Sequence, residues 1–173
     1  MPTGESFLSL AEIAIVFAGF AGISMVLGRS QGREFTVANA ARLSVMIELS
    51  VCTALVSLMP SVLLGFGASA ATTWQSSSAV AAVYCLGSAV RGGILRARSV
   101  KIVPEEAHGP VGLSFTLLLR CVATVSAFVG VFFVTARPGP LFLSLSSNLA
   151  LSAFLFVGSL WGLRELLENR DRD

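Results

Sequence analysis

Three ionisable side chains lie inside long apolar stretches of this sequence, and they have the clearest potential for chemistry. Glu12, Glu48 and Arg120 each have apolar residues as immediate neighbours on both sides. A charged side chain at the centre of a membrane helix costs about 2.5–3.5 kcal/mol on insertion scales, so it needs a partner or a function. Such residues serve in ion pathways and proton relays, or in hydrogen bonds that hold helices together.

Depth within the apolar stretches predicts a partner for Glu48. Counted along a helix at about 1.5 Å per residue, Glu48 and Arg120 lie in the same half of a membrane. The long arginine side chain can extend toward a partner at a somewhat different depth. We therefore predict an ion pair between Glu48 and Arg120. Its role stays open between a contact that joins two helices and a step in an ion or proton pathway.

Glu12 is predicted to lie in the opposite half of the membrane, where no basic residue shares its depth. Asn148 has a matching depth in the last apolar stretch. That stretch also carries several hydroxyl groups, at Ser144, Ser146, Ser147 and Ser152. We expect Glu12 either to be a neutral acid that hydrogen-bonds Asn148 or to line a water-filled pathway.

The remaining reactive residues do not form a catalytic or metal-binding pattern. Cys52, Cys85 and Cys121 are widely separated within apolar stretches, and His108 is the only histidine. Structural cysteines in such positions behave as small buried apolar residues. We therefore expect no bound metal, no cofactor and no enzymatic activity, since acid–base or nucleophilic catalysis needs partners that are missing here.

The elements that position these residues are predicted to be five membrane-spanning helices in one domain, residues 1–173. Of the 173 residues, 54% are hydrophobic and 13% are charged, about half the charged fraction of an ordinary soluble domain. A span needs about 20 apolar residues. The five stretches that satisfy this length are 7–27, 41–64, 74–95, 111–136 and 141–163. The fold class is therefore an all-α, polytopic helical membrane protein.

The basic residues predict the orientation of these spans. With five spans, ten of the twelve Lys and Arg residues fall on one side of the membrane, and that side is normally the cytoplasm. Only Arg137 falls on the other side, while Arg120 lies within a span. We therefore expect an inner (plasma) membrane protein with its N-terminus outside and its C-terminus inside. The ten residues are Arg29, Arg33, Arg42, Arg91, Arg96, Arg98, Lys101, Arg164, Arg170 and Arg172.

Two local features predict how the helices pack. Ala14, Ala18 and Gly22 recur at four-residue spacing with Gly19 beside them, a pattern that lets membrane helices approach closely. The contact could lie within the chain or between copies. Pro60, within the second stretch, removes one helical hydrogen bond and predicts a kink.

The segment Leu10–Ile23, LAEIAIVFAGFAGI, resembles the first helix of a group of small, uncharacterised bacterial membrane proteins. The segment ARLSVMIELSV, which contains Arg42 and Glu48 and is followed by Pro60, is also similar to that group. The resemblance places Glu12 in a signature segment. It implies a bacterial membrane protein and no particular activity.

Two functions from different classes fit these observations. The first is a small homo-oligomeric channel or small-solute pore, which the unpaired Glu12 and the hydroxyl-rich last stretch favour. The second is a non-catalytic accessory or scaffold subunit of a larger membrane complex, which short loops and the missing catalytic pattern favour. The expected partners are the lipid bilayer and other membrane chains. A net charge of +2 is too small to indicate nucleic acid.

Overall fold

The computed structural model describes residues 4–30, 37–99, 110–132 and 138–170, and these form helices joined by turns, without a strand in the described ranges. The prediction of an all-α protein is confirmed. The five helices are α1 (Gly4–Ser30), α2 (Val37–Gly65), α3 (Ala70–Ser99), α4 (Pro110–Phe132) and α5 (Gly139–Arg170).

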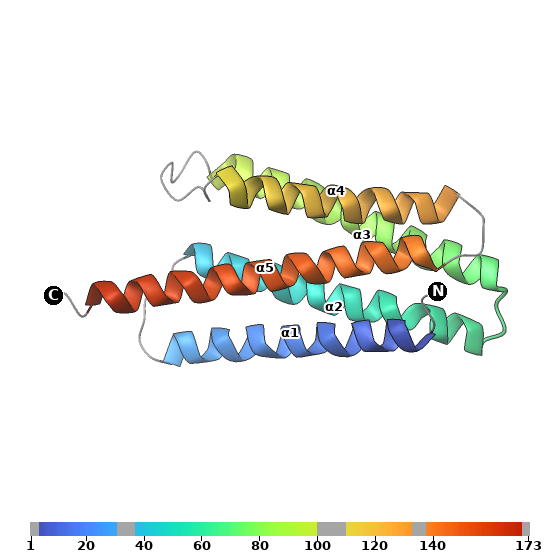
Figure 1. Ribbon diagram of the computed structural model, residues 1–173, viewed down its shortest axis with the longest axis horizontal. Helices are drawn as coiled ribbons and strands as arrows, with labels where there is room; N and C mark the ends of the chain where they lie inside the picture. Colours follow the sequence, from blue (N-terminus) through green and yellow to red (C-terminus); the bar gives the residue numbers. More distant parts are fainter. Residues whose placement is uncertain (1–3, 31–36, 100–109, 133–137, 171–173) are drawn as a thin grey trace.

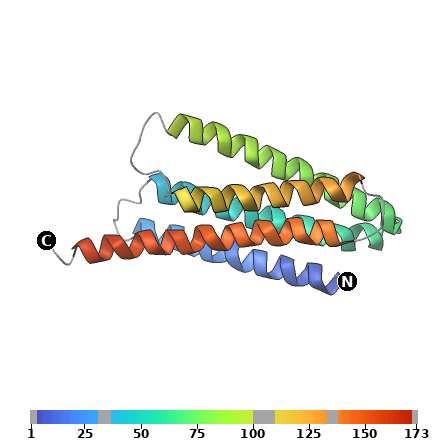
Figure 2. The same ribbon diagram turned by 45° about the horizontal axis from the view of Figure 1, so that its top comes forward.

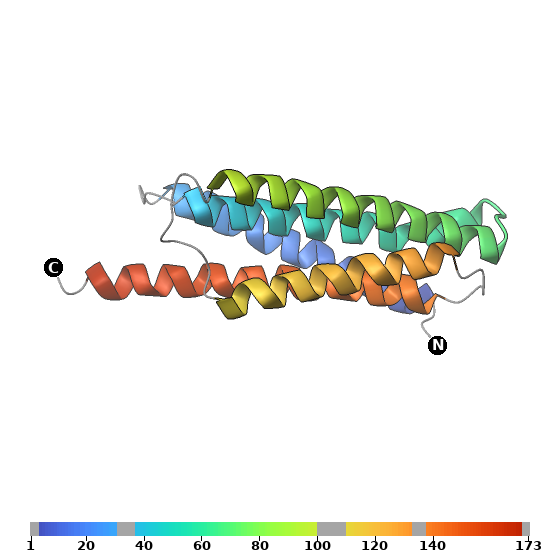
Figure 3. The same cartoon turned by 90° about the horizontal axis from the view of Figure 1, so that it is seen from above.

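The helices lie side by side along the long axis, with the chain termini at opposite ends (Figure 1). Helices α2 and α3 form one layer, and α4 and α5 form a second (Figure 3). Helix α5 is central, because it contacts each of the other four helices. Helix α1 lies at the edge, packs along α2 and α5, and meets α3 through the side chains of Phe7 and Trp74.

Four of the helices contain a segment that is long and apolar enough to cross a membrane, which makes this a multi-pass membrane protein. The four segments are Gly4–Val26, Arg42–Gly65, Ser114–Phe132 and Gly139–Gly158. The predicted third span, 74–95, lies within α3, but α3 is not among the four. Its first turns carry Thr, Gln and Ser residues, which lower its mean hydropathy. Helix α3 nevertheless runs the length of the bundle (Figure 2).

The turn between α2 and α3 fixes these two helices as an antiparallel pair. Gly67 takes a positive φ of 79°, which glycine adopts without steric cost. The amide of Ala68 donates to the carbonyl of Leu63 at 3.0 Å, which ends α2 in a Schellman motif. Ser69 then accepts a hydrogen bond from the amide of Thr72 at 3.2 Å, which caps the start of α3.

Polarity is arranged in the opposite way to a water-soluble bundle. Large apolar side chains such as Ile15, Leu55, Val83 and Val125 are well exposed, whereas many serine and threonine residues are fully buried. Exposed apolar surface on this scale is unfavourable in water but not in lipid. The outer surface is therefore suited to contact with acyl chains.

The apolar part of the interior is closed at one end by three aromatic rings. Phe7 of α1 packs against Trp74 of α3 with ring centroids 5.5 Å apart, and against Phe142 of α5 at 5.7 Å.

Close approach between α3 and α4 depends on Gly130, because a Cβ there would lie 2.5 Å from Ser78 Oγ and 2.9 Å from Ser78 Cβ.

Candidate functional site

Glu12 lies on the outward face of α1, in the middle of the exposed apolar surface. Leu8, Ile15 and Gly19 share this face and are all exposed, as the 4-3-4 spacing of these residues with Glu12 requires. The opposite face of α1 is buried at Ala11, Ala14 and Ala21. The carboxyl group of Glu12 therefore points away from the bundle interior.

The predicted hydrogen bond between Glu12 and Asn148 is wrong. Asn148 is 5% exposed and lies in the interior, where its Nδ2 donates to Cys85 Sγ at 3.6 Å. Nearby, Ser144 donates to the carbonyl of Ala123 at 2.9 Å. Asn148 and Ser144 thus connect α5 to α3 and α4, while Glu12 lies on the opposite side of α1 from this interior.

Glu5 extends the polar character of the outward face of α1. It precedes Glu12 by seven residues, about two helical turns, so the two carboxyl groups lie on the same stripe. Both residues are exposed, and Ser9 lies exposed between them. The stripe is acidic toward the beginning of α1 and apolar toward its end. We refer to Glu5, Ser9 and Glu12 as the acidic stripe.

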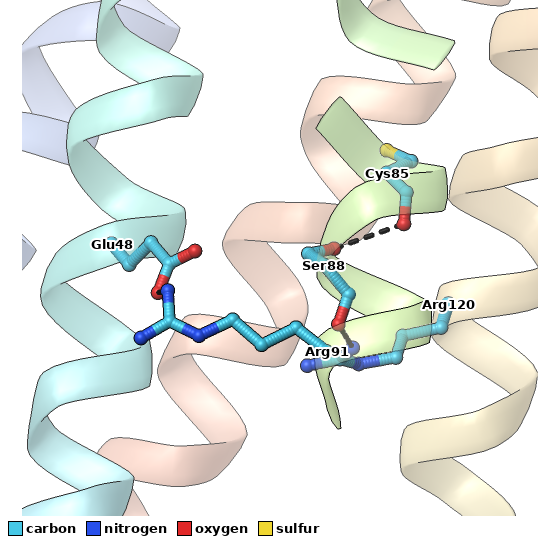
Figure 4. Close-up of polar contacts among 5 residues, drawn as sticks. All are labelled: Glu48, Cys85, Ser88, Arg91 and Arg120. Atoms are coloured by element: carbon cyan, nitrogen blue, oxygen red, sulfur yellow. Dashed lines mark hydrogen bonds and ion pairs between the residues drawn. The ribbon is translucent and has the colours of Figure 1, made fainter. Parts of the chain in front are cut away.

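The predicted ion pair between Glu48 and Arg120 is also wrong. Glu48 Oε2 on α2 pairs with Arg91 Nη1 on α3 at 3.0 Å (Figure 4). Arg120 on α4 donates instead to the carbonyl of Ser88 on α3 at 2.8 Å. The physical reason is the helix order, because α3 contacts both α2 and α4 whereas those two do not contact each other in the described ranges.

Glu48 and Arg120 therefore each have a partner on α3, and we refer to Glu48, Arg91 and Arg120 as the charged cluster. The ion pair is partly open to its surroundings, with the Arg91 side chain 65% exposed and that of Glu48 33% exposed. The carbonyl of Cys85 accepts a hydrogen bond from Ser88 Oγ at 3.0 Å in the same region (Figure 4). The charged cluster therefore joins α3 to α2 and to α4.

Buried hydroxyl groups in α2 and α3 are the feature that sequence reasoning missed. From the sequence, hydroxyl groups were noted only in the last apolar stretch, 141–163. The signal was present, because Ser50, Thr53 and Ser57 recur at helical spacing in α2. Ser50 donates to Ser152 Oγ at 3.4 Å. Among the residues whose burial the structure describes, the buried polar set is Ser50, Thr53, Ser57, Thr73, Ser77, Ser78, Ser126, Ser144, Ser147, Asn148 and Ser152.

The predicted close-packing stripe on α1 is corrected in part. Ala14 is buried in the core and Ala18 is half-buried, but a Cβ at Gly19 or Gly22 would meet nothing within 4 Å. Within the chain, those two glycines therefore do not provide a close contact. Pro60 is buried, and α2 continues through it as one helix.

Comparison of the chain with family models, with curated proteins and with solved structures found no match. The features of the described residues that bear on function are the acidic stripe, the charged cluster and the buried hydroxyls.

Proposed function

We propose that the protein is a small homo-oligomeric channel in the inner (plasma) membrane, in which the outward face of α1 from each copy lines the pore. The observation that carries this proposal is the position of Glu12 at the centre of a face that no described helix of the same chain covers. A carboxyl group facing lipid at this depth is costly. Facing a water-filled axis, it keeps its hydration.

The rest of the α1 face supports a pathway for cations. In a ring of copies, Glu5 and Glu12 form two acidic rings two helical turns apart, and acidic rings favour cations. Farther along the same face, Ile15, Gly19 and Ile23 are exposed. An apolar constriction of this kind can gate a pore by excluding water. Gly19 leaves space at the axis, since its missing side chain meets no neighbour in the chain.

The outward carboxyl also favours a second candidate, an accessory subunit of a larger membrane complex. In that arrangement a helix of another protein covers α1, and a basic or hydrogen-bonding side chain at the same depth pairs with Glu12. The two candidates differ in what lies against α1. One requires further copies of this chain, and the other requires a different protein.

Cross-linking distinguishes the two candidates. Ile15→Cys, in a chain without native cysteines, places a thiol on the face of Glu12, while Val125→Cys places one on the exposed face of α4. The channel predicts oxidative cross-links between copies at position 15 and far fewer at position 125. Cross-links from position 15 only to other membrane proteins support the accessory subunit and contradict the channel.

Ion flux tests the role of Glu12 directly. Wild type, Glu12→Gln and the control Glu168→Gln, near the end of α5, are reconstituted in liposomes, and K⁺ and Na⁺ flux is measured. Glu12→Gln should reduce cation flux about tenfold, corresponding to about 1.4 kcal/mol, because it neutralises the ring of Glu12 carboxyl groups. Glu168→Gln should conduct as wild type does. An intact wild-type oligomer without flux contradicts the channel, and equal flux in all three proteins removes Glu12 from the pathway.

A further inference from the structure

Besides the hydroxyl of Tyr84, four serine and threonine hydroxyl groups in the interior have no hydrogen-bond partner among the residues that the structure describes. They belong to Thr53 and Ser57 on α2 and to Thr73 and Ser77 on α3. Each of the four residues is at most 1% exposed. A buried hydroxyl without a partner destabilises a protein, so most buried polar atoms are paired with protein or with water.

Other hydroxyls of the same bundle avoid this cost by bonding their own helix. Thr124 donates to the carbonyl of Arg120 at 2.8 Å, and Ser147 donates to that of Leu143 at 2.8 Å. Ser126 does the same toward Val122 at 2.6 Å. This local bond is open to any helical serine or threonine, yet the four unpaired hydroxyls do not make it. They are therefore oriented toward something other than their own backbone.

The four hydroxyls lie in the half of the α2–α3 pair that is nearer the turn at Gly67. Thr53 and Ser57 are one helical turn apart, as are Thr73 and Ser77, and α2 and α3 are in contact. Ser57 precedes Gly67 by ten residues and Ser77 follows it by ten, which places them at one level of the antiparallel pair. The rings of Phe7 and Trp74 pack in the same end of the bundle and offer no hydrogen-bond acceptor of ordinary strength.

We propose that Thr53, Ser57, Thr73 and Ser77 form a binding site for water molecules between α2 and α3. Each hydroxyl has one donor and two acceptor positions, and a buried water makes about three hydrogen bonds. Water can therefore satisfy hydroxyls from both helices at once, which no apolar neighbour can do. The site lies inside each copy of the chain, so it does not require the oligomeric pore.

Magnetisation transfer from water to side chains tests the proposal on the wild-type protein. Threonine is labelled with ¹³C, the protein is placed in lipid bilayers, and water-edited solid-state NMR spectra are recorded. Thr53 and Thr73 should receive magnetisation from water. The matched control is Thr124, whose hydroxyl is bonded within α4 and which should receive little. Absence of transfer to either Thr53 or Thr73 overturns the site, and no variant has to fold for this result.

Isosteric substitution gives a second test, because hydroxyls with and without bound water predict different changes in the Tm. Thr53→Val and Thr73→Val keep the shape of the side chain and remove its hydroxyl. When water is bound at the site, each variant removes one of its hydrogen-bond partners, and the Tm should fall by about 2–4 °C. A dry, unpaired hydroxyl predicts an unchanged or higher Tm, and that result overturns the proposal. Thr124→Val controls for the loss of a threonine hydroxyl as such.

Discussion

At the residue scale, depth alone selected the wrong partner for Glu48. Residue counting along the spans places Glu48 and Arg120 in the same half of the membrane, but it does not say which helices are neighbours. Helix α3 lies between α2 and α4, and its Arg91 reaches Glu48 first. The sequence alone places Arg91 with the basic residues on the cytoplasmic side, because it lies near the end of the third apolar stretch.

The ion pair predicts a specific energetic coupling. Glu48→Gln, Arg91→Gln and their double variant should show a coupling of about 0.2–1 kcal/mol, the range for exposed pairs, because the Arg91 side chain is 65% exposed. The free energy of unfolding in detergent measures this coupling through a double-mutant cycle.

The matched control for that cycle pairs Glu48→Gln with Arg120→Gln. Arg120 bonds the carbonyl of Ser88 and not Glu48, so these two substitutions should be additive within about 0.3–0.5 kcal/mol. A larger coupling of Glu48 to Arg120 than to Arg91 would contradict the geometry.

Glu12 could be found from sequence, but the direction of its side chain could not. An ionisable residue between Ala11 and Ile13 is conspicuous in any hydropathy profile. Beyond Glu12, however, helix α1 is apolar on almost all sides as far as Val26, so periodicity does not tell its inner face from its outer face. Only packing against α2 and α5 shows that Ala14 faces inward and Glu12 outward.

At the element scale, the helices were predictable and their polar interior was not. Long apolar stretches make helices in lipid because every backbone group must be bonded internally, which is why each predicted stretch lies on one observed helix. Helices α1, α2, α3 and α5 are longer than the predicted stretches, since helical bonding continues beyond the apolar part. The end of the predicted 111–136 stretch lies outside the described residues, which stop at Phe132 in α4.

The glycine pattern shows why spacing rules alone misplace a close contact. The small residues of α1 fit the expected motif, but Gly19 and Gly22 meet no neighbour in the chain. The close approach lies at Gly130 on α4, which follows Ser126 at the same four-residue spacing but was not predicted from the sequence. Its position opposite Ser78 follows from how α3 and α4 are packed, and that packing is a property of the tertiary structure.

Two glycine substitutions should therefore act in opposite directions. Gly130→Ala should destabilise the protein by about 1–3 kcal/mol, because its new Cβ would lie 2.9 Å from Ser78 Cβ and α3 must shift. Gly19→Ala should be neutral or stabilise by up to about 1 kcal/mol, since alanine favours the helix and the space around it is open within the chain. Thermal unfolding in detergent measures both.

A rescue variant separates the clash from a general effect of Gly130. Ser78→Gly removes both atoms that would clash with the new Cβ, and Pro140 Cβ at 3.5 Å is an ordinary contact, so Gly130→Ala combined with Ser78→Gly should regain part of the lost stability. If Gly130→Ala alone is as stable as Gly19→Ala, the close approach of α3 and α4 does not exist in the membrane.

At the scale of the whole molecule, the path of the chain bears on the number of spans. Helix α2 ends at one end of the bundle and α4 begins at the other, so the chain between them must return along the full length (Figure 1). Helix α3 makes that return while packed against α2 and α4. Its lower mean hydropathy has a physical reason, because hydroxyl side chains such as Thr73 and Ser77 face the interior and not lipid.

The distribution of basic residues indicates which end of the bundle lies on the cytoplasmic side. Arg29 near the end of α1, Arg42 near the beginning of α2 and Arg91 near the end of α3 belong to one end of the bundle, and the end of α5 lies there too. Basic residues near span ends normally mark the cytoplasmic side. We therefore predict five crossings, with the beginning of α1 outside the cell and the end of α5 in the cytoplasm.

Thiol accessibility on the two sides of α3 tests this topology at the helix with the lowest mean hydropathy. In a chain without native cysteines, Phe66→Cys places a thiol in the exposed turn before α3, where the native side chain is 87% exposed. Lys101→Cys places one after α3. With five crossings, a membrane-impermeant maleimide added to intact cells should label position 66, and position 101 only after the membrane is permeabilised. Labelling of both positions from the same side would mean that α3 does not cross, and the chain would then have four spans with both termini on one side.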